Sequence, residues 1–308
     1  MLSVILPAFN EEASVPLALE RISAILSEAQ IENELIFIDD GSRDGTWGEI
    51  GKAMQRRKNV VGLRFSRNFG KEAAIFAGLE AAAGDCCVVM DCDLQHPPEK
   101  LPEMFRLWQE GYEVVEGVKE ERGTEGAAHR AAANGFYAII SRLTKLDMAA
   151  SSDFKLLDRK VVDALNAMPE RNTFFRALSY WAGFKTVKLP YQVAERAAGQ
   201  SKWSTRSLIR YAVTNIISFS SAPLQIVTIL GALLLVIAVV FGAISLYQKI
   251  AGIALGGFTT VILLQLFTGS VTMISLGVIG MYIAKIYEET KQRPRYLIAE
   301  KRRSEGRK

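Results

Sequence analysis

The residues best suited to chemistry in this sequence are two carboxylates placed two positions apart, Asp91 and Asp93. They follow residues 86–90, an apolar run whose length and composition predict a fully buried strand. Since alternate side chains of an extended backbone point the same way, we expect Asp91, Asp93 and Gln95 to present oxygen atoms on one side. Such oxygen donors suit Mg²⁺ or Mn²⁺, with water and a substrate phosphate completing the coordination.

The position of these two carboxylates at the end of a predicted strand is stronger evidence for a ligand site than their spacing. An Asp-x-Asp triplet arises roughly once by chance in a chain of this length, but ligands of open α/β sheets bind at the carboxyl ends of strands. Strands are also predicted over residues 2–7, 34–39 and 60–65, and each ends in or is followed by polar or charged residues. These residues are Asn10, Glu11, Asp39, Asp40, Arg67, Asn68 and Lys71. We therefore expect the strand ends to form one ligand site.

Helical patterns separate the predicted strands. The first has apolar residues at helical spacing from Val15 to Leu26, Asp44 is expected to cap the second, and an alanine-rich third runs to residue 83. A fifth strand is predicted over residues 112–117. This alternation indicates right-handed βαβ units, so the predicted fold class is α/β with a mostly parallel, Rossmann-like sheet. The sequence lacks Gly-x-Gly-x-x-Gly after the first strand and Gly-x-x-x-x-Gly-Lys-Ser/Thr, which argues against a dinucleotide fold and a P-loop.

Residues 118–203 have a less regular pattern. They contain four basic residues that are candidates for binding phosphate, although the default interpretation of each is a solvated surface charge. These are Arg122, Arg130, Arg196 and Lys202. Asp153 is a single carboxylate that we expect just before a helix containing Val161, Val162 and Leu165.

The composition changes sharply at residues 222–284, where Lys249 is the only charged residue. Residues 224–247 would form a helix about 36 Å long, enough to cross a bilayer, and residues 258–284 are predicted to form a second span. The tail, residues 285–308, is rich in lysine and arginine, so the positive-inside rule predicts a cytoplasmic head and two cytoplasmic termini. Two spans are too few for a pore within one chain, so a lipid path would require a homo-oligomer.

A basic amphipathic helix is predicted at residues 204–221, directly before the first span. Apolar residues recur there at helical spacing, with Arg206 and Arg210 on the opposite face. Such a helix is expected in the membrane interface, and the alternative is a surface helix that packs on the core. The predicted regions are thus a head at 1–203, this helix, a two-span region at 222–284 and the basic tail. Topology and anionic lipid explain the tail better than nucleic acid does.

Five motifs together are typical of one family. They are Leu6-Pro7-Ala8-Phe9-Asn10-Glu11-Glu12, Asp39-Asp40-Gly41-Ser42-Arg43-Asp44-Gly45-Thr46, Phe65-Ser66-Arg67-Asn68-Phe69-Gly70-Lys71-Glu72, Asp91-Cys92-Asp93-Leu94-Gln95-His96-Pro97-Pro98 and Gln200-Ser201-Lys202-Trp203. With the two C-terminal spans and Arg293-Pro294-Arg295-Tyr296, the chain resembles the family-2 glycosyltransferases of the GT-A fold, specifically the polyprenyl-phosphate glycosyltransferases. Dolichol-phosphate mannose synthases and bactoprenol glucosyltransferases belong to that group, and the run at 67–72 is most similar to the latter.

The resemblance implies a role for each motif. The nucleotide sugar would be bound by Pro7, Phe9, Glu11, Asp40, Lys71 and Asp91. Asp91, Asp93 and Gln95 would hold the metal and the diphosphate, with Asp93 as a catalytic residue. The donor diphosphate and the lipid phosphate would be gathered by Arg122, Arg130, Arg196 and Lys202. Asp153 matches the acceptor-side base, and Lys119 replaces an arginine of the mannose synthases, which loses bidentate geometry toward phosphate.

The implied reaction is the inverting transfer of a hexose to undecaprenyl phosphate at the inner membrane, for modification of cell-envelope glycans. The resemblance favours UDP-glucose and leaves GDP-mannose, UDP-GlcNAc and an aminoarabinose donor open. An inactive partner of a lipid-sugar flippase is an alternative of another class. A processive polysaccharide synthase would require Gln-x-x-Arg-Trp, which the sequence lacks. Since a phosphate monoester has a second pKa of ~6, the acceptor is largely a dianion at neutral pH, and we expect Asp153 to orient groups rather than accept a proton.

Overall fold

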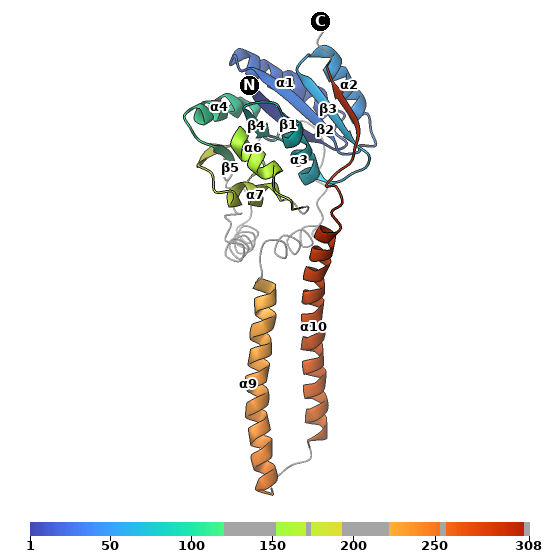
Figure 1. The fold of residues 1–308 in the computed structure, drawn as a ribbon, viewed down its shortest axis with the longest axis vertical. Helices are drawn as coiled ribbons and strands as arrows, with labels where there is room; N and C mark the ends of the chain where they lie inside the picture. Colours follow the sequence, from blue (N-terminus) through green and yellow to red (C-terminus); the bar gives the residue numbers. More distant parts are fainter. Residues whose placement is uncertain (120–151, 171–173, 193–221, 253–256, 305–308) are drawn as a thin grey trace. The chain divides into compact units, whose positions relative to one another are not determined.

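The computed structural model describes residues 1–119, 152–170, 174–192, 222–252 and 257–304 (Figure 1). The chain forms two compact units. The first comprises Met1–Trp203 together with Arg293–Lys308, and the second is Ser204–Gln292. The first unit, called the head below, therefore contains both the start and the end of the chain.

Within the described residues, the head is built on one sheet of eight strands in the order β7-β5-β6-β4-β1-β2-β3-β8. The strands are β1 (Leu2–Ala8), β2 (Asn33–Asp39), β3 (Val60–Phe65), β4 (Cys86–Val89), β5 (Val114–Lys119), β6 (Lys155–Asp158), β7 (Thr186–Tyr191) and β8 (Ile298–Arg303). The four strands β4, β1, β2 and β3 run parallel to one another, whereas β6 and β8 are antiparallel to their neighbours. The mostly parallel sheet predicted from the sequence is confirmed.

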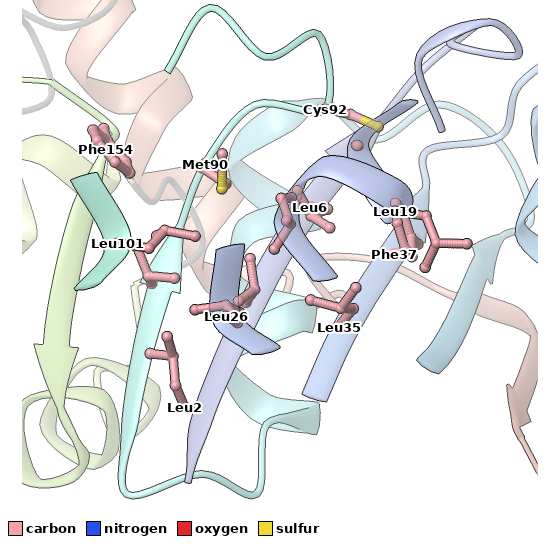
Figure 2. Packing of buried hydrophobic residues seen from close by; sticks show 14 of the residues in the cluster. Leu2, Leu6, Leu19, Leu26, Leu35, Phe37, Met90, Cys92, Leu101 and Phe154 are labelled. Carbon is pink, nitrogen blue, oxygen red and sulfur yellow. The ribbon is translucent and has the colours of Figure 1, made fainter. Parts of the chain in front are cut away.

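Helices cover both faces of this sheet. They are α1 (Ser14–Glu28), α2 (Thr46–Arg56), α3 (Lys71–Ala81), α4 (Leu101–Gln109), α6 (Arg159–Asn166) and α7 (Phe175–Trp181), with a 3-10 turn, η1 (Pro98–Lys100), before α4. On one face, Leu6 of β1 and Phe37 of β2 belong to the same buried cluster as Leu19 of α1 (Figure 2). On the other face α3 approaches so closely that a Cβ atom at Gly78 would lie 2.3 Å from Cγ2 of Ile5. Burial on both faces explains why these parallel strands are continuously apolar.

Two local details differ from the sequence pattern. Gly45, and not Asp44, is the N-cap of α2, although Oδ1 of Asp44 still accepts the N–H of Thr46 at 3.1 Å. The helix expected directly after Asp153 is preceded by β6, which pairs antiparallel with β4. β6 is only four residues long and is stabilised by tertiary pairing, so periodicity within the segment gave no indication of it.

The basic tail contributes β8 to the edge of the sheet. β8 pairs antiparallel with β3, with Leu63 opposite Lys301, and most of its side chains are exposed. Its composition therefore looks like that of a solvated tail, while its backbone supplies hydrogen bonds to β3. A short, charged strand of this kind also protects the sheet edge from pairing with other chains. Residues 298–303 are thus an integral part of the head.

The second unit contains two long apolar helices, α9 (Ala222–Ile250) and α10 (Phe258–Thr290). Among the described residues, two segments are long and apolar enough to cross a membrane, Pro223–Ile250 and Leu264–Thr290. The sequence predicts that the polar residues of the second span pack against helices. In the structure the hydroxyls of Thr268, Ser270 and Thr272 donate to carbonyls four residues earlier, at 2.8 to 2.9 Å, which satisfies them within α10 itself. The amphipathic helix expected at 204–221 lies outside the described residues.

Candidate active site

A cleft of about 280 Å³ opens where the parallel strands β1, β2, β3 and β4 end. Its walls come from all four of the loops that follow these strands. The lining residues are Pro7, Ala8, Phe9, Glu11, Asp40, Asn68, Gly70, Lys71, Ala74, Asp91, Cys92 and Asp93. The structure therefore brings together eight of the candidate residues that the sequence analysis named. Gln95 does not line the cleft.

Asp40, the residue after β2, fixes the loop between β3 and α3. Its Oδ1 accepts the N–H of Phe69 at 2.6 Å and its Oδ2 accepts the N–H of Gly70 at 2.9 Å. Burial raises the pKa of this carboxyl to about 6, while the two amides act in the opposite direction. The loop passes so close that a Cβ atom at Gly41, whose φ is +68°, would lie 2.5 Å from the backbone of Arg67. The close approach and the positive φ both require glycine there.

Lys71, the first residue of α3, lies between two carboxylates. Its Nζ is 2.6 Å from Oδ1 of Asp91 and 2.8 Å from Oδ2 of Asp153. Desolvation lowers the pKa of Lys71, but the charges of Asp91 and then Asp153 outweigh it and raise the pKa above its ordinary value. Desolvation likewise opposes ionisation of Asp91, and Lys71 outweighs it and lowers that pKa. The cleft therefore holds a permanent cation beside an ionised carboxylate.

Asp153 is paired a second time, by Arg176 of α7. Nε of Arg176 donates to Oδ1 of Asp153 at 2.6 Å and Nη2 donates to Oδ2 at 2.9 Å. Asp153 is 4% exposed, and desolvation alone would raise its pKa. Lys71 and Arg176 together hold the pKa far below the usual range of a carboxyl instead. A carboxylate with so low a pKa is a poor proton acceptor.

Sequence reasoning missed Arg176 and the buried ion pair beneath it. Lys155, which is 2% exposed, lies 3.0 Å from Oε1 of Glu116 and donates to Oγ of Ser179 at 2.8 Å. Ser179 in turn donates to the carbonyl of Arg176 at 3.1 Å, so this group supports the turn of α7 that carries the arginine. The only available signal was an arginine placed among the apolar residues of a short helix.

The expectation that Asp91, Asp93 and Gln95 extend from a strand is wrong. β4 ends at Val89, and the backbone turns through Leu94, whose φ is +59°. Gln95 contributes its backbone, since its N–H donates to Oδ1 of Asp93 at 3.0 Å. Of the three expected oxygen donors, only the carboxylates of Asp91 and Asp93 therefore line the cleft.

His96 contacts the backbone of Asp91. Its Nδ1 accepts the backbone N–H of Asp91 at 3.0 Å, and its ring is stacked on Phe154 with centroids 5.0 Å apart. An Nδ1 atom that accepts a hydrogen bond carries no proton, so the ring is neutral with its proton on Nε2. Desolvation lowers the pKa of His96 and keeps it in that state. His96 thus fixes the backbone of Asp91 without adding charge to the cleft.

The donor set of the cleft fits a hard divalent cation that shares its coordination with a substrate. Asp91 and Asp93 line the same cleft and offer oxygen atoms only. No group of three His, Cys, Asp or Glu side chains that could hold a metal occurs among the residues described. Mg²⁺ is commonly held by one or two carboxylates, with phosphate oxygens and water completing its octahedron. A metal here would therefore bind together with a phosphate ligand.

Several predicted phosphate-binding residues cannot be placed. Arg122, Arg130, Arg196 and Lys202 lie outside the described residues. Lys119 is described, and it is the exposed last residue of β5.

Comparison with known proteins gives matches over most of the chain. Residues 3–165 match the model of the glycosyl transferase family 2. Residues 211–306 match the model of the TMEM192 family, a match that covers less than half of the chain. The chain is 38% identical over 299 residues to the prophage bactoprenol glucosyl transferase homolog of Escherichia coli (strain K12), covering 96% of this chain and 98% of the relative. The bactoprenol glucosyl transferase of Shigella phage SfX is 37% identical over 299 residues, with the same coverage.

A solved structure resembles a large part of this chain. It is the glucosyl-3-phosphoglycerate synthase of Mycobacterium tuberculosis in complex with Mn²⁺, uridine-diphosphate and glucosyl-3-phosphoglycerate. The TM-score is 0.53 at 21% identity, and the match covers 71% of this chain and 80% of that one. At this level of identity the likeness shows a common fold.

Proposed function

This chain belongs to glycosyl transferase family 2 and has a GT-A head, and from that premise we propose that it transfers a hexose to a polyprenyl phosphate. The observation that carries the proposal is the cleft in which Asp91, Asp93 and Lys71 meet at the strand ends. We take UDP-glucose as the donor and undecaprenyl phosphate as the acceptor, since relatives across most of the chain are named bactoprenol glucosyl transferases.

The donor's nucleoside would bind at the side of the cleft formed by the loop after β1. Phe9 is 39% exposed and, with Pro7, offers an apolar surface to the base, while Glu11 offers oxygen atoms to ribose hydroxyls. Each oxygen of Asp40 accepts one hydrogen bond from the loop, from the N–H of Phe69 or of Gly70. The main task of Asp40 would therefore be to hold the loop that carries Lys71, and its remaining lone pairs would bind the nucleoside.

Departure of the nucleoside diphosphate requires positive charge near its phosphates. An oxygen of the lipid phosphate forms a bond to the anomeric carbon while the bond from that carbon to the diphosphate breaks, with inversion. Asp91 and Asp93 would hold Mg²⁺ or Mn²⁺, which when bound supplies Lewis-acid stabilisation of the leaving phosphates. Lys71 would add a fixed cation of the protein's own on the same side, because its ammonium already lies against Asp91.

Asp153 would act as a positioning residue in this reaction. A phosphate dianion is itself the nucleophile and has no proton to lose, so the acceptor requires no base. The ion pairs of Asp153 with Lys71 and Arg176 instead fix two cations beside the cleft. Arg176 is thereby a candidate for binding the acceptor phosphate, in addition to the arginines that the sequence predicted.

The chain path supports a cytoplasmic head with two membrane spans. β8, which follows α10, pairs with β3, which precedes α9, so the two ends of the apolar region must lie on the same side of the bilayer. An even number of spans meets this requirement. The basic residues after α10 favour the cytoplasmic side of the inner membrane. A homo-oligomer would be needed only for a lipid path through the protein.

The test is transfer from radiolabelled UDP-glucose, UDP-GlcNAc and GDP-mannose to undecaprenyl phosphate by the full-length protein in detergent. Each donor is assayed with Mg²⁺, with Mn²⁺ and with EDTA. We expect label to enter the lipid from one donor, and to be lost with EDTA and with Asp93→Ala. If the folded protein transfers no sugar from any donor, the proposal fails and an inactive partner of a lipid-sugar flippase becomes the better interpretation.

A further inference from the structure

The segment that follows α10 crosses the head beside the loop that carries Lys71. We call residues 294–303 the C-terminal strap. Its second half is β8, and just before β8 the carbonyl of Leu297 accepts the N–H of Ser66 at 3.0 Å. Ser66 is the first residue after β3, where the loop to α3 begins. The strap therefore contacts the cleft loop at its start.

Three aromatic rings extend this contact. The ring of Tyr296 is stacked on Phe65, with centroids 5.0 Å apart and planes 13° apart. Phe65 in turn meets Phe69 edge to face, with centroids 5.7 Å apart. Phe65 is 2% exposed, so it cannot shift without disturbing the core. The hydroxyl of Tyr296 donates to Glu80 of α3 and does not touch Phe65.

The last ring of the series belongs to Phe69, a residue of the loop that forms part of the cleft wall. Phe69 lies between Asn68 and Gly70, which both line the cleft, and its N–H donates to Asp40 at 2.6 Å. The next residues are Gly70, also bound to Asp40, and Lys71, whose ammonium lies against Asp91. A displacement of Phe69 would therefore change both the Asp40 contacts and the start of α3.

We propose that Tyr296 is a positioning residue for the donor cleft, acting through Phe65 and Phe69 on the loop that carries Lys71. The inference rests on the proposed function, because it concerns the same cleft. Tyr296 follows Thr290, the last residue of α10, by six residues, which span at most about 22 Å when extended. The element that holds the donor loop is thus covalently close to the end of a candidate membrane span.

The competing interpretation is that the strap only covers the sheet edge. In that case the loss of the Tyr296 ring would lower stability but leave the affinity of the folded protein for nucleotide unchanged. A ring contact that positions the loop would instead weaken nucleotide binding, by about 2- to 10-fold for one aromatic pair. The hydroxyl and the ring separate these contributions, since only the ring touches Phe65.

The experiment compares Tyr296→Leu, Tyr296→Phe and Glu80→Gln in the full-length protein in detergent. The probe is UDP or GDP with Mn²⁺, whichever the unchanged protein binds more tightly, and binding is measured by calorimetry beside Tm. We expect Tyr296→Leu to raise the Kd for nucleotide and the donor KM by about 2- to 10-fold, with the KM for undecaprenyl phosphate unchanged. Tyr296→Phe and Glu80→Gln keep the stacked ring, and each should bind nucleotide like the unchanged protein.

Phe69→Leu provides a second test from within the loop, should Tyr296→Leu fold poorly. Because both changes act on one series of rings, Phe69→Leu should raise the nucleotide Kd by itself, and the double variant should show less than the product of the two effects. Unchanged nucleotide affinity in Tyr296→Leu or in Phe69→Leu, in a protein that otherwise transfers sugar, overturns the inference alone. Failure of the unchanged protein to bind either nucleotide or to transfer sugar overturns the proposed function, and the inference with it.

Discussion

Arg176 and Asp153 form a two-point ion pair, with 2.6 Å between Nε and Oδ1 and 2.9 Å between Nη2 and Oδ2. The planar guanidinium matches the carboxylate, which makes this pair shorter and more directional than an ordinary surface pair. With Lys71 on the other side of Asp153, two cations share one buried anion. The carboxylate that family resemblance suggested as a base is therefore the anion that organises the positive side of the site.

Asp153→Asn tests this role. We expect a loss of activity of about 100-fold, because an amide no longer holds Arg176 by charge and leaves Lys71 paired with Asp91 alone. The loss should be nearly the same at pH 6.5 and pH 8.5, since the pKa of Asp153 lies far below both values. The measurement is kcat against pH for both proteins.

Asp163→Asn is the matched control, because Asp163 lies on α6 with 64% of its side chain exposed and pairs only loosely with Arg159, at 3.8 Å. That change should leave kcat unaltered. An Asp153→Asn protein that retains most activity at pH 8.5 but loses it steeply on acidification would support a helper base and contradict our assignment.

Arg176 should be sensitive to geometry as well as to charge. Arg176→Lys keeps the charge but cannot form the two-point contact, so we expect a loss of about 10-fold in kcat. Arg176→Met removes the charge and should cost about 100-fold. Equal losses of kcat in the two variants would mean that the two-point contact with Asp153 is unimportant. Arg106→Lys, on the exposed surface of α4, is the control and should leave kcat unchanged.

The residues of the cleft could be predicted because each parallel strand is recognisable from the local sequence pattern alone. Each strand was apolar enough to identify, and the polar residues after it had to meet at one sheet edge. That reasoning brought together Glu11, Asp40, Lys71 and Asp91 without any knowledge of tertiary contacts. It failed for Gln95, because it assumed an extended backbone where Leu94 takes a positive φ.

Other parts of the structure could not be read from local patterns. Arg176 lies 23 residues after Asp153, and their contact depends on how α7 packs against the sheet. β8 has mostly exposed side chains, so no apolar pattern distinguishes it from a solvated tail. In both cases the information lies in long-range pairing, which composition and periodicity do not contain.

Glu72 should make the head less stable as the pH rises. Burial, and then Asp153, raises its pKa from 4.5 to about 7, so between these values the folded state binds more protons than the unfolded state. Stability therefore falls as the pH rises from about 4.5 to about 7. Glu72→Gln removes this loss, and we expect its Tm to exceed that of the unchanged protein by about 2–4 °C at pH 8 but hardly at all at pH 4.5.

Thermal unfolding at the two pH values measures this difference. Glu103→Gln, which replaces a carboxylate of α4 that is 39% exposed and pairs with Lys100, serves as the control and should give no gain in Tm at pH 8. A Glu72→Gln protein that is less stable than the unchanged one at pH 8 would show that the ionised carboxylate is favoured in the fold.

Truncation to alanine should lower the transfer activity strongly at Asp93 and only slightly at Gln95. Asp93→Ala removes a carboxylate from the cleft, and we expect a loss of at least about 100-fold in metal-dependent transfer. Gln95→Ala keeps the backbone N–H that donates to Asp93, so kcat should change by less than about 3-fold. Titration of activity with Mn²⁺ checks both variants. A large loss of kcat in Gln95→Ala, together with a higher half-saturating Mn²⁺ concentration, would show that the side chain of Gln95 is a metal ligand.

Lys71 and a divalent cation should compete for Asp91. The ammonium lies 2.6 Å from Oδ1 of Asp91, so a metal that used this oxygen would have to displace it. Without nucleotide, Lys71→Met should therefore bind Mn²⁺ about 3- to 10-fold more tightly, because the competing cation is gone. With donor and acceptor present, the same change should lower kcat by about 100-fold, because the leaving diphosphate loses a fixed cation. The two effects are separated by measuring Mn²⁺ binding by electron paramagnetic resonance and kcat in the transfer assay.

Lys52→Met, on the exposed surface of α2, is the control and should change neither quantity. Weaker Mn²⁺ binding in Lys71→Met would mean that the lysine organises the carboxylates for the metal instead of competing with it.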